Sequence, residues 1–232
     1  MTTTEKSIST AKSLSFRVIF TGLLCACAFF ASAQSGSSDR KSQYLFPDFD
    51  TCQVKMKSGT INNVIANYNT ITEKMVFMID GTPHDMTSTT FVDTVTIRGR
   101  QFVPVKEAFY EVLFDAPVAL FVENKSDLVD PGQPSGYGGR SQTSAIDRVS
   151  MIKNGELFYN LELPDEYTIK PSPLYWIRKD FEMSSFLSKR QFLKIFPDQK
   201  DELEQFMKQN NLKTDDPEDV IRLVQYCNEI MP

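Results

Sequence analysis

Histidine is almost absent from this sequence, because His84 is the only one among 232 residues. Zinc sites and Ser-His-Asp triads depend on histidine as a ligand or a general base, so most zinc enzymes and triad hydrolases are excluded. A surplus of positive charge is also missing, since 25 Lys and Arg stand against 30 Asp and Glu and the pI is near 5.1. A general nucleic-acid binder needs a concentrated basic surface, and we therefore predict no nucleic-acid partner.

The sequence also lacks a phosphate-binding loop, a dinucleotide fingerprint, paired zinc-ligand spacing and a nucleophile elbow. We interpret His84 as a surface residue of a turn between strands, with no nucleophile or orienting acid singled out for it. The pairs Asp48/Asp50 and Asp127/Asp130 lack the ligand number and glycine placement of a calcium loop, and we interpret them as solvated carboxylates. We accordingly predict no catalytic residue, no metal site and no cofactor.

The N-terminal segment has the order of a cleavable secretory signal. Basic residues precede an apolar run over residues 18–31, and Ala31-Ser32-Ala33 supplies the small residues of a cleavage site. An apolar run of about 14 residues is short for the roughly 20 that span a bilayer. We therefore predict cleavage after Ala33 rather than a membrane anchor, and a mature protein in the periplasm, at the outer membrane or outside the cell.

One alternative to simple secretion stays open. Leu24-Cys25-Ala26-Cys27 resembles a lipobox, in which Cys27 would carry a lipid that holds the protein at a membrane. Phe29 and Phe30 weigh against this interpretation, since the acylated cysteine of a lipoprotein is normally followed by polar residues. Without that lipid, we expect any membrane association to be peripheral.

Cleavage after Ala33 would leave two cysteines, Cys52 and Cys227, in a compartment that permits disulfides. A disulfide between them would join the start of the folded region to its end and stabilise it by about 4–5 kcal/mol in the chain-entropy model. The alternative is a buried free thiol, because Cys227 lies on the apolar stripe of a predicted helix.

After a polar linker over residues 34–43, short apolar runs alternate with turn signals, the pattern of an antiparallel β domain. Hairpins are predicted around Ser58-Gly59 and Arg98-Gly99, and the apolar run at residues 75–79 predicts a buried strand. Pro104 indicates an edge strand because proline cannot donate a hydrogen bond to a neighbour.

Residues 123–148 interrupt this pattern with four of the ten glycines, which predicts a long loop. Part of the loop combines an aromatic ring, a cation and exposed backbone donors, a combination suited to recognition. A merely flexible connector is the alternative. The candidate binding residues are Tyr137, Gly138, Gly139, Arg140, Ser141 and Gln142.

The C-terminal part changes to helical spacing. Ser188 and Gln191 have the spacing of a capping box, Pro197 ends that helix, and Asp216 followed by Pro217 opens the last one. We interpret the charged residues here, among them Lys200 and Glu204, as the solvent face of the helices, with partner binding as the alternative. We predict an α+β fold, with a mostly antiparallel sheet (a meander or a small barrel or sandwich) before a short three-helix region. The segments are a signal peptide (1–33), a flexible linker (34–43), a β-rich domain (44–165), a connector (166–183) and a helical region (184–231).

Four segments carry a resemblance to a known group of proteins: Ala31–Gln34, Asn67-Tyr68-Asn69, Tyr137–Thr143 and Phe196–Lys200. In them, and across nearly the whole mature chain, the sequence resembles uncharacterised exported proteins of Bacteroidetes. The resemblance implies a periplasmic or outer-membrane-associated location. No activity is attached to that group, so the resemblance assigns no functional residue.

We expect a non-catalytic exported envelope protein that binds a protein, a glycan or another surface component. Two alternatives stay open: a periplasmic hydrolase with a carboxylate-based site, and a structural accessory of an outer-membrane assembly. A deep pocket with two close carboxylates of separated pKa values would favour the hydrolase. A flat apolar patch beside residues 123–148 would favour the binding protein.

Overall fold

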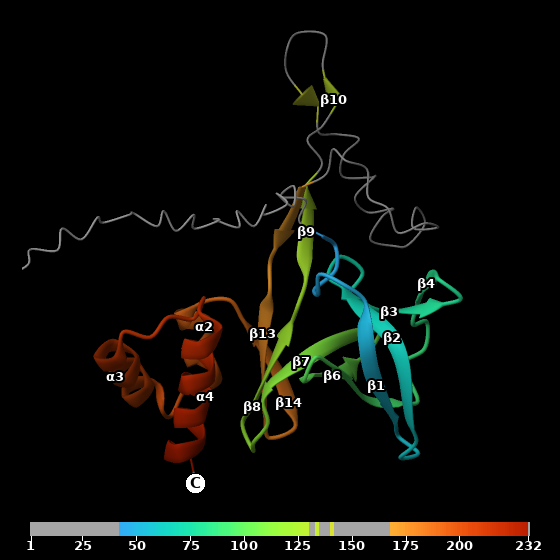
Figure 1. The fold of residues 1–232 in the computed structure, drawn as a ribbon. Coiled ribbons are helices and arrows are strands. Elements are labelled where there is room, and N and C mark those ends of the chain that lie inside the picture. Colours follow the sequence, from blue (N-terminus) through green and yellow to red (C-terminus); the bar gives the residue numbers. More distant parts are fainter. Residues whose placement is uncertain (1–41, 130–132, 135–139, 142–167, 232) are drawn as a thin grey trace, which may run out of the picture. The chain divides into compact units, whose positions relative to one another are not determined.

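The computed structural model describes residues 42–129, 133–134, 140–141 and 168–231. The predicted signal peptide, nearly all of the predicted linker and a hairpin expected at Asn154-Gly155 lie outside these residues. Within them an antiparallel sheet of ten strands precedes three helices, which confirms the predicted α+β fold (Figure 1). None of the described helices has the length and apolarity needed to cross a membrane.

The ten strands lie in the order β14-β13-β8-β7-β6-β5-β1-β2-β3-β4, and every neighbouring pair is antiparallel. Most neighbours are also consecutive in sequence, as expected for hairpins joined by short turns. Two small ribbons, β9 with β12 and β10 with β11, accompany the sheet. The strands are β1 (Asp50–Met56), β2 (Ile61–Asn69), β3 (Lys74–Ile79), β4 (Thr82–Asp85), β5 (Val92–Ile97), β6 (Arg100–Val105), β7 (Ala108–Phe114), β8 (Ala119–Glu123), β9 (Ser126–Val129), β10 (Gln133–Pro134), β11 (Arg140–Ser141), β12 (Thr168–Pro171), β13 (Leu174–Lys179) and β14 (Glu182–Phe186).

The predicted hairpins around Ser58-Gly59 and Arg98-Gly99 are confirmed as β1–β2 and β5–β6. Arg98 and Gly99 have φ values of 49° and 79°, so the turn between β5 and β6 is left-handed at both central positions. This turn matches the right-handed twist of the flanking strands, and glycine reaches such a φ without steric cost. The predicted strand at residues 75–79 is also confirmed, as β3.

Residues 166–183, which we predicted to be a connector, contain strands instead. β12 pairs with β9, and β13 and β14 extend the sheet beyond β8. Pro171 ends β12 and Pro173 precedes β13, so the prolines flank these strands rather than interrupt them. The predicted loop at residues 123–148 likewise includes β9 and the two short strands β10 and β11.

Pro104 does not mark an edge strand, because β6 lies between β5 and β7. The pairing of β5 with β6 reaches only from Arg100 to Phe102 on β6. Pro104 therefore faces a partner on one side, where it stands opposite Phe109 of β7. The Phe109 N–H donates to the carbonyl of Glu73, in the turn before β3, at 3.2 Å and not to Pro104. Pro104 and Phe109 are therefore not a hydrogen-bonded pair, and the missing N–H of Pro104 costs no bond to β7.

The helices α2 (Lys189–Ile195), α3 (Lys200–Asn210) and α4 (Pro217–Ile230) begin where the sequence indicates. The Ser188 side chain accepts a hydrogen bond from Gln191 N, and Asp216 Oδ1 accepts one from Glu218 N at 2.9 Å. Both predicted N-caps are thereby confirmed, and each satisfies a backbone donor that the helix itself leaves unpaired.

Two large hydrophobic clusters lie among the described residues, beside a smaller third one around Tyr110, Ala119 and Phe121. The first lies between the helices and the β8–β13–β14 end of the sheet, with Leu120, Ile177 and Phe186 facing Leu223 and Val224 of α4. The second lies inside the curled β1–β7 part, around side chains such as Tyr68, Phe102 and Phe109. Asn228 joins α4 to the start of β8, since its side-chain amide bonds both the N–H and the carbonyl of Val118 at 2.9 Å.

The disulfide between Cys52 and Cys227 is not formed in this structure. Both are free, buried thiols, and they belong to different clusters, Cys52 on β1 in the curled part and Cys227 on α4 under the helices. Each sulfur packs in a separate hydrophobic cluster. The structure therefore agrees with the second alternative from the sequence, in which Cys227 is a buried free thiol.

Candidate functional site

The binding site predicted from sequence lies mostly outside the described residues. Tyr137, Gly138, Gly139 and Gln142 are among those not described, while Arg140 and Ser141 form β11, paired with Gln133–Pro134. The structure therefore places two of the six residues, and only on the backbone of this short ribbon.

The other residues singled out in the sequence lie apart. His84 is exposed as predicted, but it lies on strand β4 at the edge of the sheet rather than in a turn. Asp50, at the start of β1, accepts a hydrogen bond from Arg98 at 2.7 Å, which is the main reason that its pKa lies below the usual value. Asp127 lies on β9 and Asp48 precedes β1. No group of three or more metal-ligating side chains occurs in the described part of the chain.

Two buried glutamates bear on the hydrolase alternative. Glu111 on β7 is 5% exposed and Glu123 on β8 is 8% exposed. Glu111 stands opposite Val122, the residue before Glu123, so the two carboxylates point to opposite faces of the sheet. They do not form a facing pair across one pocket, which is the arrangement that carboxylate-based hydrolysis uses.

Each glutamate also has its own hydrogen-bond donors. Arg100 donates two hydrogen bonds to Glu111, and Asn124 Nδ2 donates a third at 2.8 Å. On the other face Trp176 Nε1 donates to Glu123 at 2.8 Å. These contacts satisfy carboxylates that burial would otherwise make unfavourable, and they indicate a structural role.

Two tyrosines lie close enough to these carboxylates to sense their charge. Burial and the neighbouring Glu123 raise the pKa of Tyr110 to about 12. Burial, followed by the charges of Glu73 and Glu123, raises the pKa of Tyr68 far above its ordinary value. Both hydroxyls therefore stay protonated across the physiological range and can serve only as neutral hydrogen-bonding groups.

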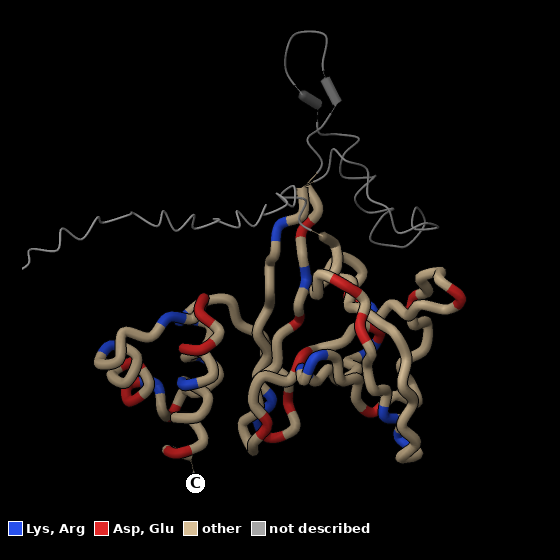
Figure 2. The backbone as a smooth tube through the Cα atoms, viewed as in Figure 1, with Lys and Arg blue, Asp and Glu red and all other residues tan. Residues whose placement is uncertain are grey.

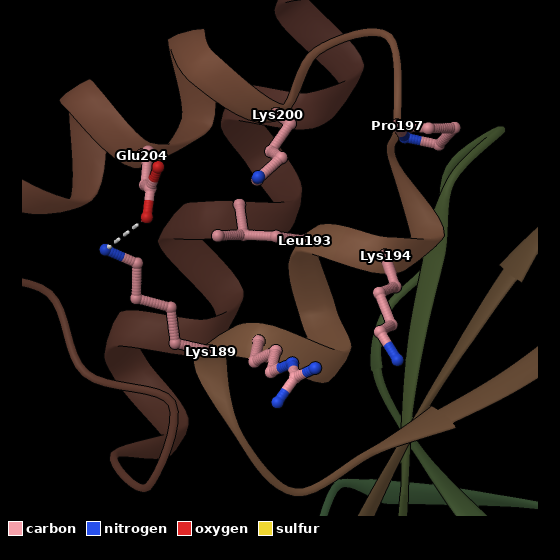
Figure 3. Close-up of a pocket in the computed structure, with 7 residues that line it drawn as sticks. Lys189, Leu193, Lys194, Pro197, Lys200 and Glu204 are labelled. Atoms are coloured by element: carbon pink, nitrogen blue, oxygen red, sulfur yellow. Dashed lines mark ion pairs between the residues drawn. The ribbon is translucent and has the colours of Figure 1, made fainter.

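A concave site lies in the helical region, and Lys200 and Glu204, whose charges the sequence assigned to a solvent face with partner binding as the alternative, are part of its lining (Figure 3). We call it the basic pocket. Its volume is about 620 Å³, within the range of ordinary ligand pockets. It is lined by Lys189, Arg190, Leu193 and Lys194 of α2, Pro197 of the following turn, and Lys200 and Glu204 of α3.

The local sequence explains this geometry. Leu193 belongs to the apolar stripe of α2 and is only 4% exposed, so it forms a floor, while its basic neighbours point to the solvent side. Pro197 ends α2 and lets α3 turn back alongside it. Figure 3 shows Lys189 reaching across from α2 to Glu204 of α3, with Leu193 between Lys189 and Lys200.

The charges of the basic pocket are unbalanced. Lys189 Nζ lies 3.2 Å from Glu204 Oε1, and this ion pair also borders a second hollow of about 580 Å³ towards the end of α3. Arg190, Lys194 and Lys200 have no ion-pair partner among the described residues. Lysine and arginine stems can cover apolar surface while the charged groups stay in water. The pocket is thus suited to a ligand with carboxylates and an apolar group.

The sequence signal for this pocket was weak but present. α2 carries three basic side chains and no acidic one, while α3 carries charges of both signs. Figure 2 marks these charged positions along the chain. An amphipathic helix with a charged solvent face has the same pattern, and only the return of α3 makes a pocket of it.

Comparison with known protein families, with curated proteins and with solved structures finds no match to this chain. The functional argument therefore depends on the chain's own residues.

Proposed function

We propose that this chain is a non-catalytic binding protein of the cell envelope and that the basic pocket holds an acidic segment of a partner protein. The observation that carries the proposal is the excess of positive charge around an apolar floor. Arg190, Lys194 and Lys200 line the pocket beside Leu193, and none of the three has an ion-pair partner within the described part of the chain. In a protein with more acidic than basic residues, such a concentration attracts an acidic partner selectively.

A protein segment fits this pocket better than a purely polar ligand. Carboxylates of the segment would pair with the exposed ammonium and guanidinium groups at the rim. An apolar side chain between them would cover the exposed ring of Pro197 and the lysine stems above Leu193, which supplies binding energy that charge alone gives poorly in water. The hydrolase alternative has less support, because the buried Glu111 and Glu123 lie on opposite faces of the sheet.

Peptide binding tests this proposal. The probe is a fluorescein-labelled peptide with a phenylalanine between aspartates and glutamates, and fluorescence anisotropy measures its binding to the chain that begins at Gln34. We expect Arg190→Glu/Lys194→Glu to weaken binding at least tenfold, since each lost pair also becomes a repulsion. Lys57→Glu/Lys213→Glu is the matched control, because it changes the net charge equally at exposed lysines outside the pocket.

Two further measurements make the result decisive. A peptide with asparagine and glutamine in place of its acids should bind much more weakly, and raised salt should weaken the acidic peptide. Equal affinity of the pocket variant and its control for the acidic peptide would refute the proposal.

The envelope location has its own test. The N-terminal residue of the protein recovered from the envelope should be Gln34 if the signal is cleaved after Ala33. An N-terminal Cys27 that carries acyl chains would instead establish the lipoprotein alternative, and an intact Met1 with no export would overturn both.

A further inference from the structure

The turn between β13 and β14 differs from the comparable turns of the sheet. Lys179 pairs with Glu182, so Asp180 and Phe181 form a two-residue turn with φ values of 51° and 67°. Two other described turns are left-handed at both central positions, Asp80-Gly81 and Arg98-Gly99. Both place glycine second, as this turn type prefers. The β13–β14 turn has phenylalanine there, at a φ that disfavours any side chain with a Cβ atom.

Packing does not explain the phenylalanine, because the Phe181 side chain is 100% exposed. Neither the backbone conformation nor a contact within the described residues selects this residue. A residue that is unfavourable for local structure and unused by the core is a candidate for an interaction with another molecule. Exposed aromatic rings at a protruding position are frequent anchors of protein interfaces.

The charges beside Phe181 indicate what it would bind. Asp180 and Glu182 flank it and are both exposed. The other strongly exposed apolar residues of the described chain, such as Ile65 and Phe91, have no acid on both sides. The turn thus presents an aromatic ring between two carboxylates, which is the composition that the basic pocket is suited to receive. An anionic lipid surface, by contrast, would repel these carboxylates.

We infer that the Asp180-Phe181-Glu182 tip of one copy of this chain docks in the basic pocket of a second copy. The inference rests on the proposed function, since the receiving pocket is the same. In the docked pair the Phe181 ring packs on the exposed Pro197 and lies against a cationic side chain of the pocket rim. Asp180 and Glu182 pair with the remaining cations. The tip does not occupy its own chain's pocket, because Phe181 is fully exposed.

The contact is of the head-to-tail type, because two different surfaces meet. Figure 1 shows β14 running from the tip to the loop that leads into α2. Each copy has one tip and one pocket, so a single contact leaves the pair with one free tip and one free pocket. Such contacts build rings or open chains rather than closed two-fold dimers. A single hairpin tip is a small interface, so the association is weak and visible only at high protein concentration.

Sedimentation velocity of the chain beginning at Gln34, from about 10 μM to 1 mM at low salt, tests the inference. The weight-average sedimentation coefficient of the wild type should rise with concentration and fall back on addition of salt. Phe181→Gly should abolish the rise while preserving the turn, because glycine is the ordinary residue at this φ. Phe91→Ala is the matched control, since it removes another exposed phenylalanine, 69% exposed, outside the tip.

A mixing experiment separates this inference from a general charge effect. Phe181→Gly keeps its pocket but lacks the tip, and Arg190→Glu/Lys194→Glu keeps its tip but lacks the pocket. Each variant alone should stay monomeric, and an equimolar mixture should form pairs that stop at two chains.

The outcomes distinguish the inference from the proposed function. A wild type that stays monomeric to 1 mM, or a Phe181→Gly chain that associates like the wild type, overturns the inference. Either result leaves the proposed function standing if the pocket still binds the acidic peptide. Phe181-dependent binding to neutral or anionic lipid vesicles without self-association would instead assign the tip to a membrane and also overturn the inference.

Discussion

Arg100 on β6 and Glu111 on β7 form an ion pair with two parallel hydrogen bonds, from Nε to Oε1 and from Nη2 to Oε2. The Glu111 side chain is 6% exposed and that of Arg100 is 37% exposed, so the carboxylate is buried while the guanidinium reaches solvent. The same guanidinium lies 5.1 Å from the ring centroid of Phe46. Arg100 therefore links two adjacent strands and the segment that precedes β1.

The Arg100–Glu111 pair predicts an asymmetric response to substitution. Arg100→Met should lower the free energy of unfolding by about 2–3 kcal/mol, because it leaves a buried carboxylate with only Asn124 as a side-chain donor. The loss should be smaller in Arg100→Met/Glu111→Met, which removes the unpaired charge as well. Urea unfolding measures both variants, and an equal loss in the two would mean that the buried charge is not the cause.

The two cysteines are predicted to be present as protected thiols. Burial raises the pKa of Cys52 to about 11 and that of Cys227 to about 12, which leaves little thiolate at pH 8. In the mature chain we expect both to react with an aromatic disulfide reagent roughly 100-fold more slowly when folded than in urea. Mass spectrometry without reductant should then find two free thiols. An intact Cys52–Cys227 bridge in envelope material would contradict the structure.

Asp85 predicts a dependence of stability on pH. Burial raises the pKa of this β4 carboxyl above 3.8, and its buried Oδ1 has no hydrogen-bond partner among the residues that the structure describes. Well below pH 3.8 the Asp85 carboxyl is protonated in both the folded and the unfolded protein. Above its folded pKa the folded protein must hold a buried negative charge, which lowers its stability. Asp85→Asn should therefore be more stable than the wild type at pH 7, by less than about 1 kcal/mol because the group is only half buried.

The difference in stability between Asp85→Asn and the wild type should disappear as the pH falls below about 3.8, because Asp85 of the wild type is then also neutral. Thermal unfolding at several pH values measures it. Asp80→Asn, at an exposed turn position, is the control for the loss of one carboxylate.

Phe181→Gly should stabilise the folded chain. The left-handed φ of 67° is unfavourable for phenylalanine and the side chain has no packing to lose, so we expect a gain of about 1 kcal/mol and a higher Tm. Gly99→Ala supplies the opposite test, because a Cβ atom there would meet no other atom within 4 Å and the loss comes from the backbone alone. An unchanged or lower Tm for Phe181→Gly would show that the phenylalanine serves the fold after all.

The sequence alone predicted features that depend on a few adjacent residues. Glycine second in the Arg98-Gly99 turn defines a hairpin, and Asp216 before Pro217 defines the start of α4. These features follow from φ preferences and from backbone donors that a nearby side chain satisfies. The same local reasoning failed at Pro104, because whether a proline lies at an edge depends on how far the next strand extends.

Other features required the tertiary structure because they join distant residues. β13 pairs with β8 across 50 or more positions, which turns a predicted connector into part of the sheet. The register of β7 and β8 places Glu111 and Glu123 on opposite faces, and the packing of the helices separates Cys52 from Cys227.

Local sequence thus determined the turns, the helix starts and the order of strands before helices, since short-range sterics and hydrogen bonds decide them. Only the tertiary structure decided which charges meet. The basic residues of α2 and the Asp180-Phe181-Glu182 tip have ordinary sequence patterns, and they become a pocket and an exposed anchor only when helix packing and strand pairing place them.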